Sequence, residues 1–259
     1  MKRLAESQIV WWHNGQDFAE IQLPAPDAEV VPGVFWGRAD ELFTPSFWKY
    51  QSQIMGHRRQ YLDHELGRCL AEEVAACLLG GYGIPAELGL AAFERLRDAK
   101  LLEGRPSAAE LEAELRKDFK VANRRRKYRF AKQKSVYLAG ALCSIASDKP
   151  PEEPHQLRLY LTSLKGVGPK TASWVVRNHC ASDQVAILDV HIMRAGIRIG
   201  LFSQDADPSK QYYQLEERFL SFCDAIEEPA SRMDAIMWDF MRRIGSRSRP
   251  RPLDSQLAA

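Results

Sequence analysis

A lysine stands where two predicted helices meet at a glycine-rich turn. Residues 155–180 read HQLRLYLTSLKGVGPKTASWVVRNHC, with apolar side chains at helical spacing on both sides of the turn KGVG at 165–168. Pro169 suits the first position of a helix, because its φ is already fixed and its missing N–H is not needed there. The sequence therefore predicts a helix, a tight hairpin and a second helix that begins around Lys170.

This arrangement allows two kinds of chemistry. Gly166 and Gly168, on either side of Val167, let the hairpin backbone approach another molecule closely, and the N–H groups at a helix start can hold a DNA phosphate. A lysine amine attacks carbon only in its neutral form, which a helix start and partial burial both favour. Lys170 is therefore a candidate nucleophile, and a plain phosphate contact is the alternative role.

A carboxylate follows within reach of the same region. Asp189, in the segment VAILDVHIMRAG, precedes an apolar helix expected over residues 190–199. A carboxylate there could stabilise positive charge on a sugar or move protons. It also suits a helix N-cap, and one aspartate can do both. His179 and His191 lie near these helices, where lone histidines are typically structural or solvated.

The segment resembles the helix-hairpin-helix DNA glycosylases that carry a glycine/proline-rich loop and an aspartate. The resemblance covers about residues 65–245 and is most specific at 159–200. It implies that Lys170 is the nucleophile of a bifunctional glycosylase and AP lyase, and that Asp189 is the essential aspartate. In the implied reaction Lys170 attacks C1′ of a flipped nucleotide, the base leaves, a Schiff base forms, and β-elimination cuts the strand.

The cysteines narrow the branch of this superfamily. Five are present, widely scattered and without a C-x-x-C pair: Cys69, Cys77, Cys143, Cys180 and Cys223. This spacing argues against a disulfide framework, a zinc site or an iron–sulfur cluster. Branches that attack damaged pyrimidines or adenine usually carry a C-terminal cluster, so the chain looks like the 8-oxoguanine branch. A pyrimidine-lesion enzyme similar to endonuclease III and a non-catalytic DNA-binding module remain the alternatives.

A base pocket is expected around three aromatic or acidic side chains. Asp234 and Trp238 lie four residues apart on a C-terminal helix, a spacing that looks like the base-pocket pair of archaeal 8-oxoguanine glycosylases. A carboxylate can accept from guanine N–H groups while an indole stacks on the ring. Trp174, one turn after Lys170, is a candidate second wall, and Gln51 with Gln53 a candidate contact. A core tryptophan and a solvated aspartate are the alternative.

Local rather than global charge favours nucleic acid. The net charge is only +2, but residues 124–134 read RRRKYRFAKQK, with seven cations and no acid. Such clusters build phosphate-binding faces, although a solvated helix face has the same composition. The candidate contacts are Arg125, Arg126, Lys127 and Arg129. A second cluster comprises Arg242, Arg243, Arg247, Arg249 and Arg251.

The elements that must hold these residues are mainly helical. We expect a mainly α fold of two helical subdomains with the site in the cleft, in three parts: a β/loop element at 1–45, the helical domain at 46–245 and a flexible basic tail at 246–259. A small β-hairpin with a two-residue type I′ turn is expected at Asn14–Gly15. Apolar spacing predicts helices over 46–62, 64–80, 86–99, 107–118 and 130–147, and three prolines make 148–154 a loop.

Partners and surroundings follow from composition and resemblance. The chain has 259 residues, 45% of them hydrophobic, and no apolar run long enough to cross a bilayer. Without a signal-peptide pattern or a disulfide framework, we expect a cytoplasmic monomer, nucleoid-associated in a bacterium. Its partner is damaged double-stranded DNA. No cofactor or catalytic metal is expected, although the resemblance allows a monovalent cation at the hairpin carbonyls near Gly166 and Gly168.

Overall fold

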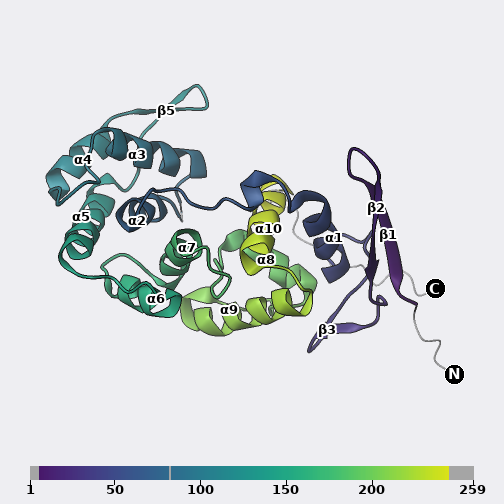
Figure 1. Ribbon diagram of the computed structural model, residues 1–259. Coiled ribbons are helices and arrows are strands. Elements are labelled where there is room, and N and C mark those ends of the chain that lie inside the picture. Colours follow the sequence, from purple (N-terminus) through teal and green to yellow (C-terminus); the bar gives the residue numbers. More distant parts are fainter. Residues whose placement is uncertain (1–5, 82, 245–259) are drawn as a thin grey trace.

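Two helical lobes lie side by side in the computed structural model, which describes residues 6–81 and 83–244 (Figure 1). The first lobe is formed by six consecutive helices and one strand pair between residues 70 and 179. The second lobe combines the N-terminal strands and first helix with the last three helices. Each lobe has its own hydrophobic core. Buried side chains between residues 23 and 61 pack with those between residues 186 and 241 in the second lobe, and separate clusters form in the first lobe. The expected two-subdomain helical fold is confirmed.

The first lobe runs from α2 to α7. Its elements are α2 (Leu70–Leu79), α3 (Ala86–Asp98), α4 (Ala108–Arg116), β5 (Phe119–Val121), β6 (Arg124–Arg126), α5 (Ala131–Ser147), α6 (Pro154–Ser163) and α7 (Pro169–His179). Helix α2 packs against α3, α5 and α7, so it forms the centre of this lobe. The predicted loop is present at 148–153, with Pro154 already the first residue of α6, and the helix–hairpin–helix of α6 and α7 is present.

The second lobe contains both ends of the described chain. Its elements are β1 (Gln8–His13), β2 (Phe18–Leu23), β3 (Glu29–Val31), β4 (Val34–Phe35), α1 (Pro45–Met55), the 3₁₀ helix η1 (Arg59–Tyr61), α8 (Val190–Ile199), α9 (Pro208–Ala225) and α10 (Ala230–Ile244). Each strand pair is antiparallel. Trp48, fully buried, packs in an aromatic cluster with Phe43, Phe47 and Phe240 and so joins α1 to α10.

Three local predictions were wrong. The N-terminal hairpin is present, but its loop has four residues rather than two, because the Asn14 side chain accepts from the N–H groups of Gln16 and Asp17 and closes a wider turn. The helix expected over 46–62 ends at Met55, and the chain then turns so that the Tyr61 hydroxyl reaches Asp239.

The helix expected over 64–80 begins only at Leu70. The carboxylates of Glu72 and Glu73 accept hydrogen bonds from the backbone N–H groups of residues 66–68, which fold back over the first turn of α2. The preceding residues are therefore held as a loop rather than as another helical turn.

Arginines 124–126 form a strand rather than part of a helix. β6 pairs with β5 across a turn at Ala122 and Asn123, both with positive φ. Arg247, Arg249, Arg251 and the tail expected at 246–259 lie outside the described residues.

Candidate active site

Lys170 lies in the first turn of α7, directly after the hairpin. Gly168 is the N-cap of this helix and Pro169 its first residue, as predicted. Gly166 has a φ of +87°, and a Cβ there would lie 2.1 Å from the Tyr137 ring, so both the backbone conformation and the packing require glycine. A Cβ at Gly168 would meet nothing within 4 Å, which leaves that backbone open to another molecule. The Val167 side chain is buried, so only its backbone is available to DNA.

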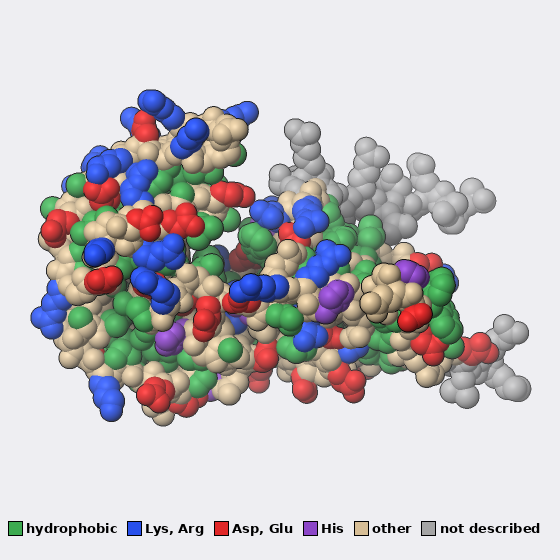
Figure 2. Space-filling model, turned by 45° about the horizontal axis from the view of Figure 1, so that its top comes forward, with side chains coloured by type: hydrophobic (Ala, Val, Ile, Leu, Met, Phe, Trp, Pro, Cys, Tyr) green, Lys and Arg blue, Asp and Glu red, His purple; other side chains and the backbone are tan. Residues whose placement is uncertain are grey.

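Lys170 lines two cavities. The first, of about 300 Å³, is bounded by Gly80, Gly81, Phe130, Gln133, Lys134, Lys170, Thr171 and Trp174. The second, of about 420 Å³, is bounded by Gly168, Pro169, Lys170, Leu188, Pro208, Ser209, Lys210, Tyr212 and Tyr213. The amine-bearing side chain is therefore accessible from both sides and does not point into packed interior. Figure 2 shows a hollow between the lobes with Lys and Arg side chains around its rim.

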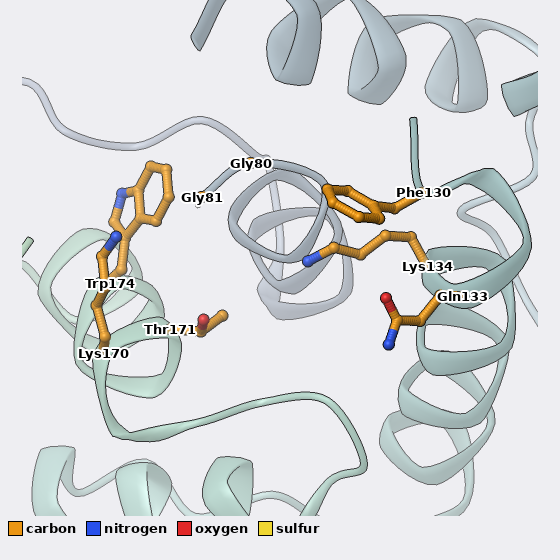
Figure 3. Close-up of a pocket in the computed structure, with 8 residues that line it drawn as sticks. All are labelled: Gly80, Gly81, Phe130, Gln133, Lys134, Lys170, Thr171 and Trp174. Carbon is orange, nitrogen blue, oxygen red and sulfur yellow. The ribbon is translucent and has the colours of Figure 1, made fainter. Parts of the chain in front are cut away.

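Trp174 and Lys134 share the first cavity with Lys170 (Figure 3). Trp174 stands one turn after Lys170 on the same side of α7, as predicted, and its ring packs near Gly80, where a Cβ would lie 3.1 Å from the indole. Lys134 extends from α5 on the opposite side. Burial lowers the pKa of Lys134, and the charge of Lys170 lowers it further. Two lysines that face one cavity make it attractive to an anion or to an acceptor-rich group.

Asp189 caps α8 and leaves one carboxylate oxygen outside the cap. Its Oδ1 accepts from the N–H groups of His191 and Ile192 at 2.8 and 3.0 Å. The expected N-cap geometry is present. Leu188, the residue before it, lines the second cavity together with Lys170. Leu188 thereby brings the segment that leads to Asp189 to the same cavity as Lys170.

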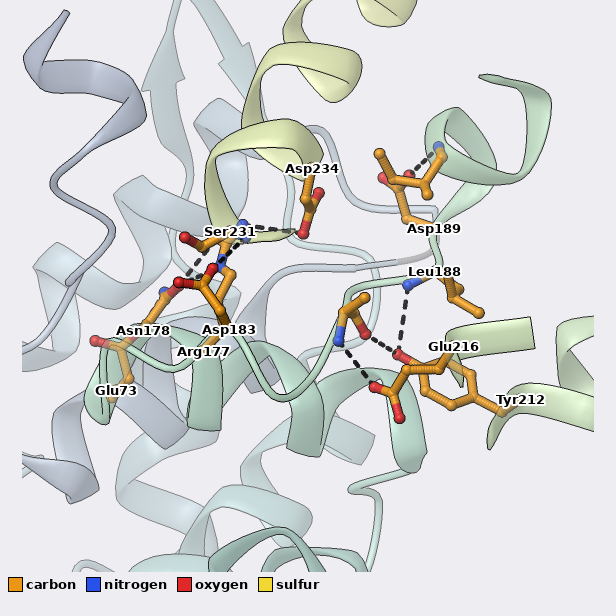
Figure 4. A network of polar contacts seen from close by, with 12 residues as sticks. Glu73, Arg177, Asn178, Asp183, Leu188, Asp189, Tyr212, Glu216, Ser231 and Asp234 are labelled. Carbon is orange, nitrogen blue, oxygen red and sulfur yellow. Dashed lines mark hydrogen bonds and ion pairs between the residues drawn. The ribbon is translucent and has the colours of Figure 1, made fainter. Parts of the chain in front are cut away.

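Asp234 is present near this region but is not open to it. It is 3% exposed and pairs with Arg177 of α7 at 3.1 Å (Figure 4). Burial raises the pKa of Asp234 to about 7, although the charge of Arg177 opposes that shift. Sequence reasoning missed Arg177, because no local pattern connects positions that are 57 residues apart.

The other predicted pocket residues do not line either cavity. Trp238 is half-buried, with its ring edge near His191 and the Arg242 guanidinium over its face. Gln51 is half-buried on α1, and Gln53 donates to Glu228. Neither cavity is lined by Gln51, Asp234 or Trp238. Their role in base recognition stays a prediction.

The basic strand pair projects from the first lobe next to the first cavity. Arg124, Arg125, Arg126, Lys127 and Arg129 are all exposed. Tyr128 lies within this basic segment, two residues before Phe130, which lines the first cavity. The buried Tyr128 hydroxyl donates to the Leu79 carbonyl at 2.6 Å, and the next residue, Gly80, also lines the cavity. This bond attaches the strand pair β5–β6 with residues 127–129, which we call the basic hairpin, to the wall of the first cavity. Sequence reasoning found the charge but missed Phe130, Gln133 and Lys134 as cavity residues.

No cluster of three or more His, Cys, Asp or Glu side chains that could hold a metal ion occurs among residues 6–81 and 83–244. In the same part of the chain, no helix is both long and apolar enough to cross a bilayer.

A family model described as 8-oxoguanine DNA glycosylase matches residues 58–228. The chain belongs to this family. The match contains α2–α7, α8 and α9, and therefore the hairpin, Lys170 and Asp189. The resemblance drawn from the hairpin motif and the 8-oxoguanine branch inferred from the cysteines is thus confirmed at the level of the family.

Individual relatives agree with this assignment. The 8-oxoguanine DNA glycosylase/AP lyase of Fusobacterium nucleatum is 30% identical over 78 residues, which are 29% of this chain and 36% of that protein. The match thus spans about a third of that relative. The crystal structure of the 8-oxoguanine DNA glycosylase of Thermotoga maritima is similar with a TM-score of 0.60 and 22% identity, covering 76% of this chain and 96% of that one.

A trapped covalent complex of endonuclease III with DNA is equally similar in fold. Its TM-score is 0.60 at 17% identity, covering 78% of this chain and 87% of that one. At such identities the likeness establishes the shared fold, which a protein named as an 8-oxoguanine DNA glycosylase and one named as endonuclease III have in common. The fold therefore does not decide the lesion.

Proposed function

We propose that this protein is a base-excision repair enzyme that removes 8-oxoguanine from duplex DNA and then cleaves the strand as an AP lyase. The observation that carries the proposal is the position of Lys170. It follows a hairpin open to another molecule at Gly168, borders two cavities, and lies opposite a segment that ends in Asp189. Family membership and the name of the Fusobacterium relative support the same activity.

In the proposed reaction Lys170 is the nucleophile and Asp189 the stabilising carboxylate. The neutral amine attacks C1′ of the flipped nucleotide, the bond from C1′ to the base breaks, and the base leaves with the bonding electrons and takes up a proton. Asp189 stabilises the positive charge that develops on the sugar. The lysine nitrogen then gives up a proton, the C1′–O4′ bond breaks and O4′ takes up a proton, which opens the sugar ring and leaves a protonated Schiff base. Loss of a proton from C2′ of this Schiff base expels the 3′ phosphate, which is β-elimination. The covalent DNA complex of the fold relative endonuclease III is consistent with this route.

We assign the flipped base to the space beside Trp174. An indole can stack on a purine, and Asp234 and Trp238 remain the proposed partners on the other lobe. Asp234 would have to leave Arg177 to reach a base, so its contribution depends on a rearrangement of that ion pair. The basic hairpin and the backbone at Gly166–Gly168 would hold phosphates and offset the unstacking cost of a few kcal/mol. The monovalent cation at the hairpin carbonyls stays a prediction.

Borohydride trapping on defined duplexes tests this function. The protein is incubated with duplexes that contain 8-oxoguanine, thymine glycol or uracil, with and without borohydride, beside the variant Lys170→Gln. We expect a covalent adduct and strand cleavage with 8-oxoguanine, and neither with the variant. Adducts with thymine glycol alone would make it a pyrimidine-lesion enzyme. Binding without an adduct on any duplex would make it a DNA-binding module.

A further inference from the structure

Two side chains of α9 face the segment that leads to Asp189. Tyr212 and Glu216 stand one turn apart, are 6% and 3% exposed, and both bond to residues 186–188 (Figure 4). We call this pair the α9 clamp. It is not part of the hairpin motif, and the reaction described above does not use it.

Glu216 joins three elements through one carboxylate. Its Oε1 accepts from the Ser173 hydroxyl on α7 at 3.0 Å and from the Ala186 N–H at 2.9 Å. Its Oε2 accepts from Arg158 on α6. The nucleophile's helix and the segment before Asp189 therefore meet at a single oxygen atom.

Tyr212 holds the same segment at a second point. Its hydroxyl donates to the Ala186 carbonyl at 2.7 Å and accepts weakly from the Leu188 N–H at 3.4 Å. Burial and the charge of Glu216 raise the pKa of Tyr212, so the hydroxyl stays protonated and available as a donor. Together, the two clamp residues bond α9 to the N–H and the carbonyl of Ala186 and to the N–H of Leu188.

The positions of these bonds connect them to the site. Ser173 lies three residues after Lys170 on α7, close to the same face, while Ala186 and Leu188 lie three residues and one residue before Asp189. Burying a carboxylate is costly unless it is paired and hydrogen-bonded, and apolar side chains could pack these elements without it. Apolar packing, however, would leave the extended segment free to slide, whereas these bonds fix it to particular atoms.

We propose that Tyr212 and Glu216 are positioning residues that set where the Asp189 carboxylate lies relative to Lys170. This inference rests on the proposed function. Since reacting groups displaced by about 1 Å can lose a hundredfold in rate, removing the clamp should slow base excision while the DNA-binding surface stays intact.

The test compares Tyr212→Phe with Tyr61→Phe. Tyr61 is the matched control, because its buried hydroxyl also donates to a buried acceptor, Asp239, at 2.8 Å, but this bond joins η1 to α10 and does not involve residues 186–188. Both variants are measured for melting temperature, for affinity to an uncleaved lesion duplex, and for the single-turnover excision rate at saturating protein. We expect Tyr212→Phe to excise about tenfold or more slowly with unchanged affinity, and Tyr61→Phe to lose a similar amount of melting temperature but to keep the wild-type rate.

Two further variants keep the proposal testable if Tyr212→Phe does not fold. Glu216→Gln retains an oxygen that can accept from Ser173 and Ala186, so it should keep most of the rate that Glu216→Ala loses. Equal excision rates for wild type, Tyr212→Phe and Glu216→Ala overturn the clamp but not the proposed function. The same holds if losses of excision rate only follow losses of melting temperature across all variants, including Tyr61→Phe. A wild type without activity on any lesion duplex overturns the proposed function and the clamp with it.

Discussion

Arg177 on α7 and Asp234 on α10 form a buried ion pair with an N–O distance of 3.1 Å. The pair ties the helix that carries Lys170 to the last helix of the other lobe. Asn178, next to Arg177, donates to Glu73 of α2 at 2.6 Å and accepts from the Arg177 guanidinium, so the interaction continues into the centre of the first lobe (Figure 4). The relative position of the two lobes, and so the width of the cleft between them, depends on these buried charges.

The burial of Asp234 makes stability depend on pH. Burial raises the pKa of Asp234 from 3.8 to about 7, so between these values the folded protein holds a proton that the unfolded chain releases. Its contribution to stability is therefore full below about pH 4 and is lost as pH rises through about 7.

Asp234→Asn removes this titration. Urea unfolding of wild type and variant at pH 5, 6, 7 and 8 should show the wild type losing stability relative to the variant, by at most about 1.4 kcal/mol per pH unit up to about pH 7. Other titrating groups are common to both proteins and cancel in the difference. A difference that is constant over this range contradicts the assignment.

Substitutions at Asp189 can separate its role as the N-cap of α8 from the effect of its charge on the reaction. Asparagine is as good an N-cap as aspartate, so Asp189→Asn should keep the bonds to the His191 and Ile192 N–H groups and melt near the wild type. Asp189→Ala should lose about 1 kcal/mol of stability. If the charge acts on the sugar, both variants should lose excision activity by about a hundredfold or more, as expected when a group that stabilises transition-state charge is removed.

Single-turnover excision and thermal melting, measured on both variants, check this prediction. An asparagine variant with full activity would assign Asp189 to capping only.

The basic hairpin should control salt dependence rather than chemistry. Replacing Arg125 and Arg126 by alanine removes two exposed cations, and each phosphate that is no longer neutralised should make the slope of log affinity against log salt shallower by about 0.9. The excision rate at saturating protein should change little. Arg38→Ala is the control, because Arg38 is also exposed but pairs with Asp40 on the second lobe. Titrations of a lesion duplex between about 50 and 200 mM salt measure the slopes, and equal slopes in all three proteins contradict a DNA contact at this hairpin.

The active-site hairpin was predictable because its signals are local. Two glycines, a proline and a lysine within a few residues specify the turn, the helix start and the position of the amine, without information from the rest of the chain. The cap at Asp189 is local in the same sense. The charge of residues 124–126 was also evident, but consecutive arginines do not show the alternation of a half-buried strand, because all three side chains are exposed on β6.

The rest of the site depends on contacts between distant residues. Arg177 meets Asp234 57 positions away, and Glu216 meets Ser173 43 positions away. No spacing rule on one helix predicts such pairs. The pocket expected around Asp234 assumed a carboxylate free to bind a base, and the alternative was a solvated aspartate, whereas folding buries it against a cation that the pattern did not include. The helix start expected at 64 failed for a more local reason, since Glu73 accepts from backbone N–H groups six and seven residues before it and holds them as a folded-back loop.

The two hairpin glycines should differ sharply when replaced by alanine. Gly166→Ala places a side chain at a φ of +87° and directs its Cβ into the Tyr137 ring, so it should lose at least about 1–2 kcal/mol of stability from the backbone conformation, and more from the displaced ring. Gly168→Ala has extended backbone and open space around its Cβ, so it should lose no more than the roughly 1 kcal/mol that alanine costs at an N-cap.

DNA affinity should fall more in Gly168→Ala than in Gly166→Ala, although Gly168→Ala is the more stable variant. The new methyl group at position 168 occupies the space where a phosphate would approach the start of α7. Urea unfolding and duplex binding on both variants give the comparison. A Gly168→Ala protein that is stable and binds with wild-type affinity would show that DNA does not approach the backbone at this point, and the phosphate-binding role would then move to the second cavity's Lys210 and Ser209, which border Lys170 from the side of α9.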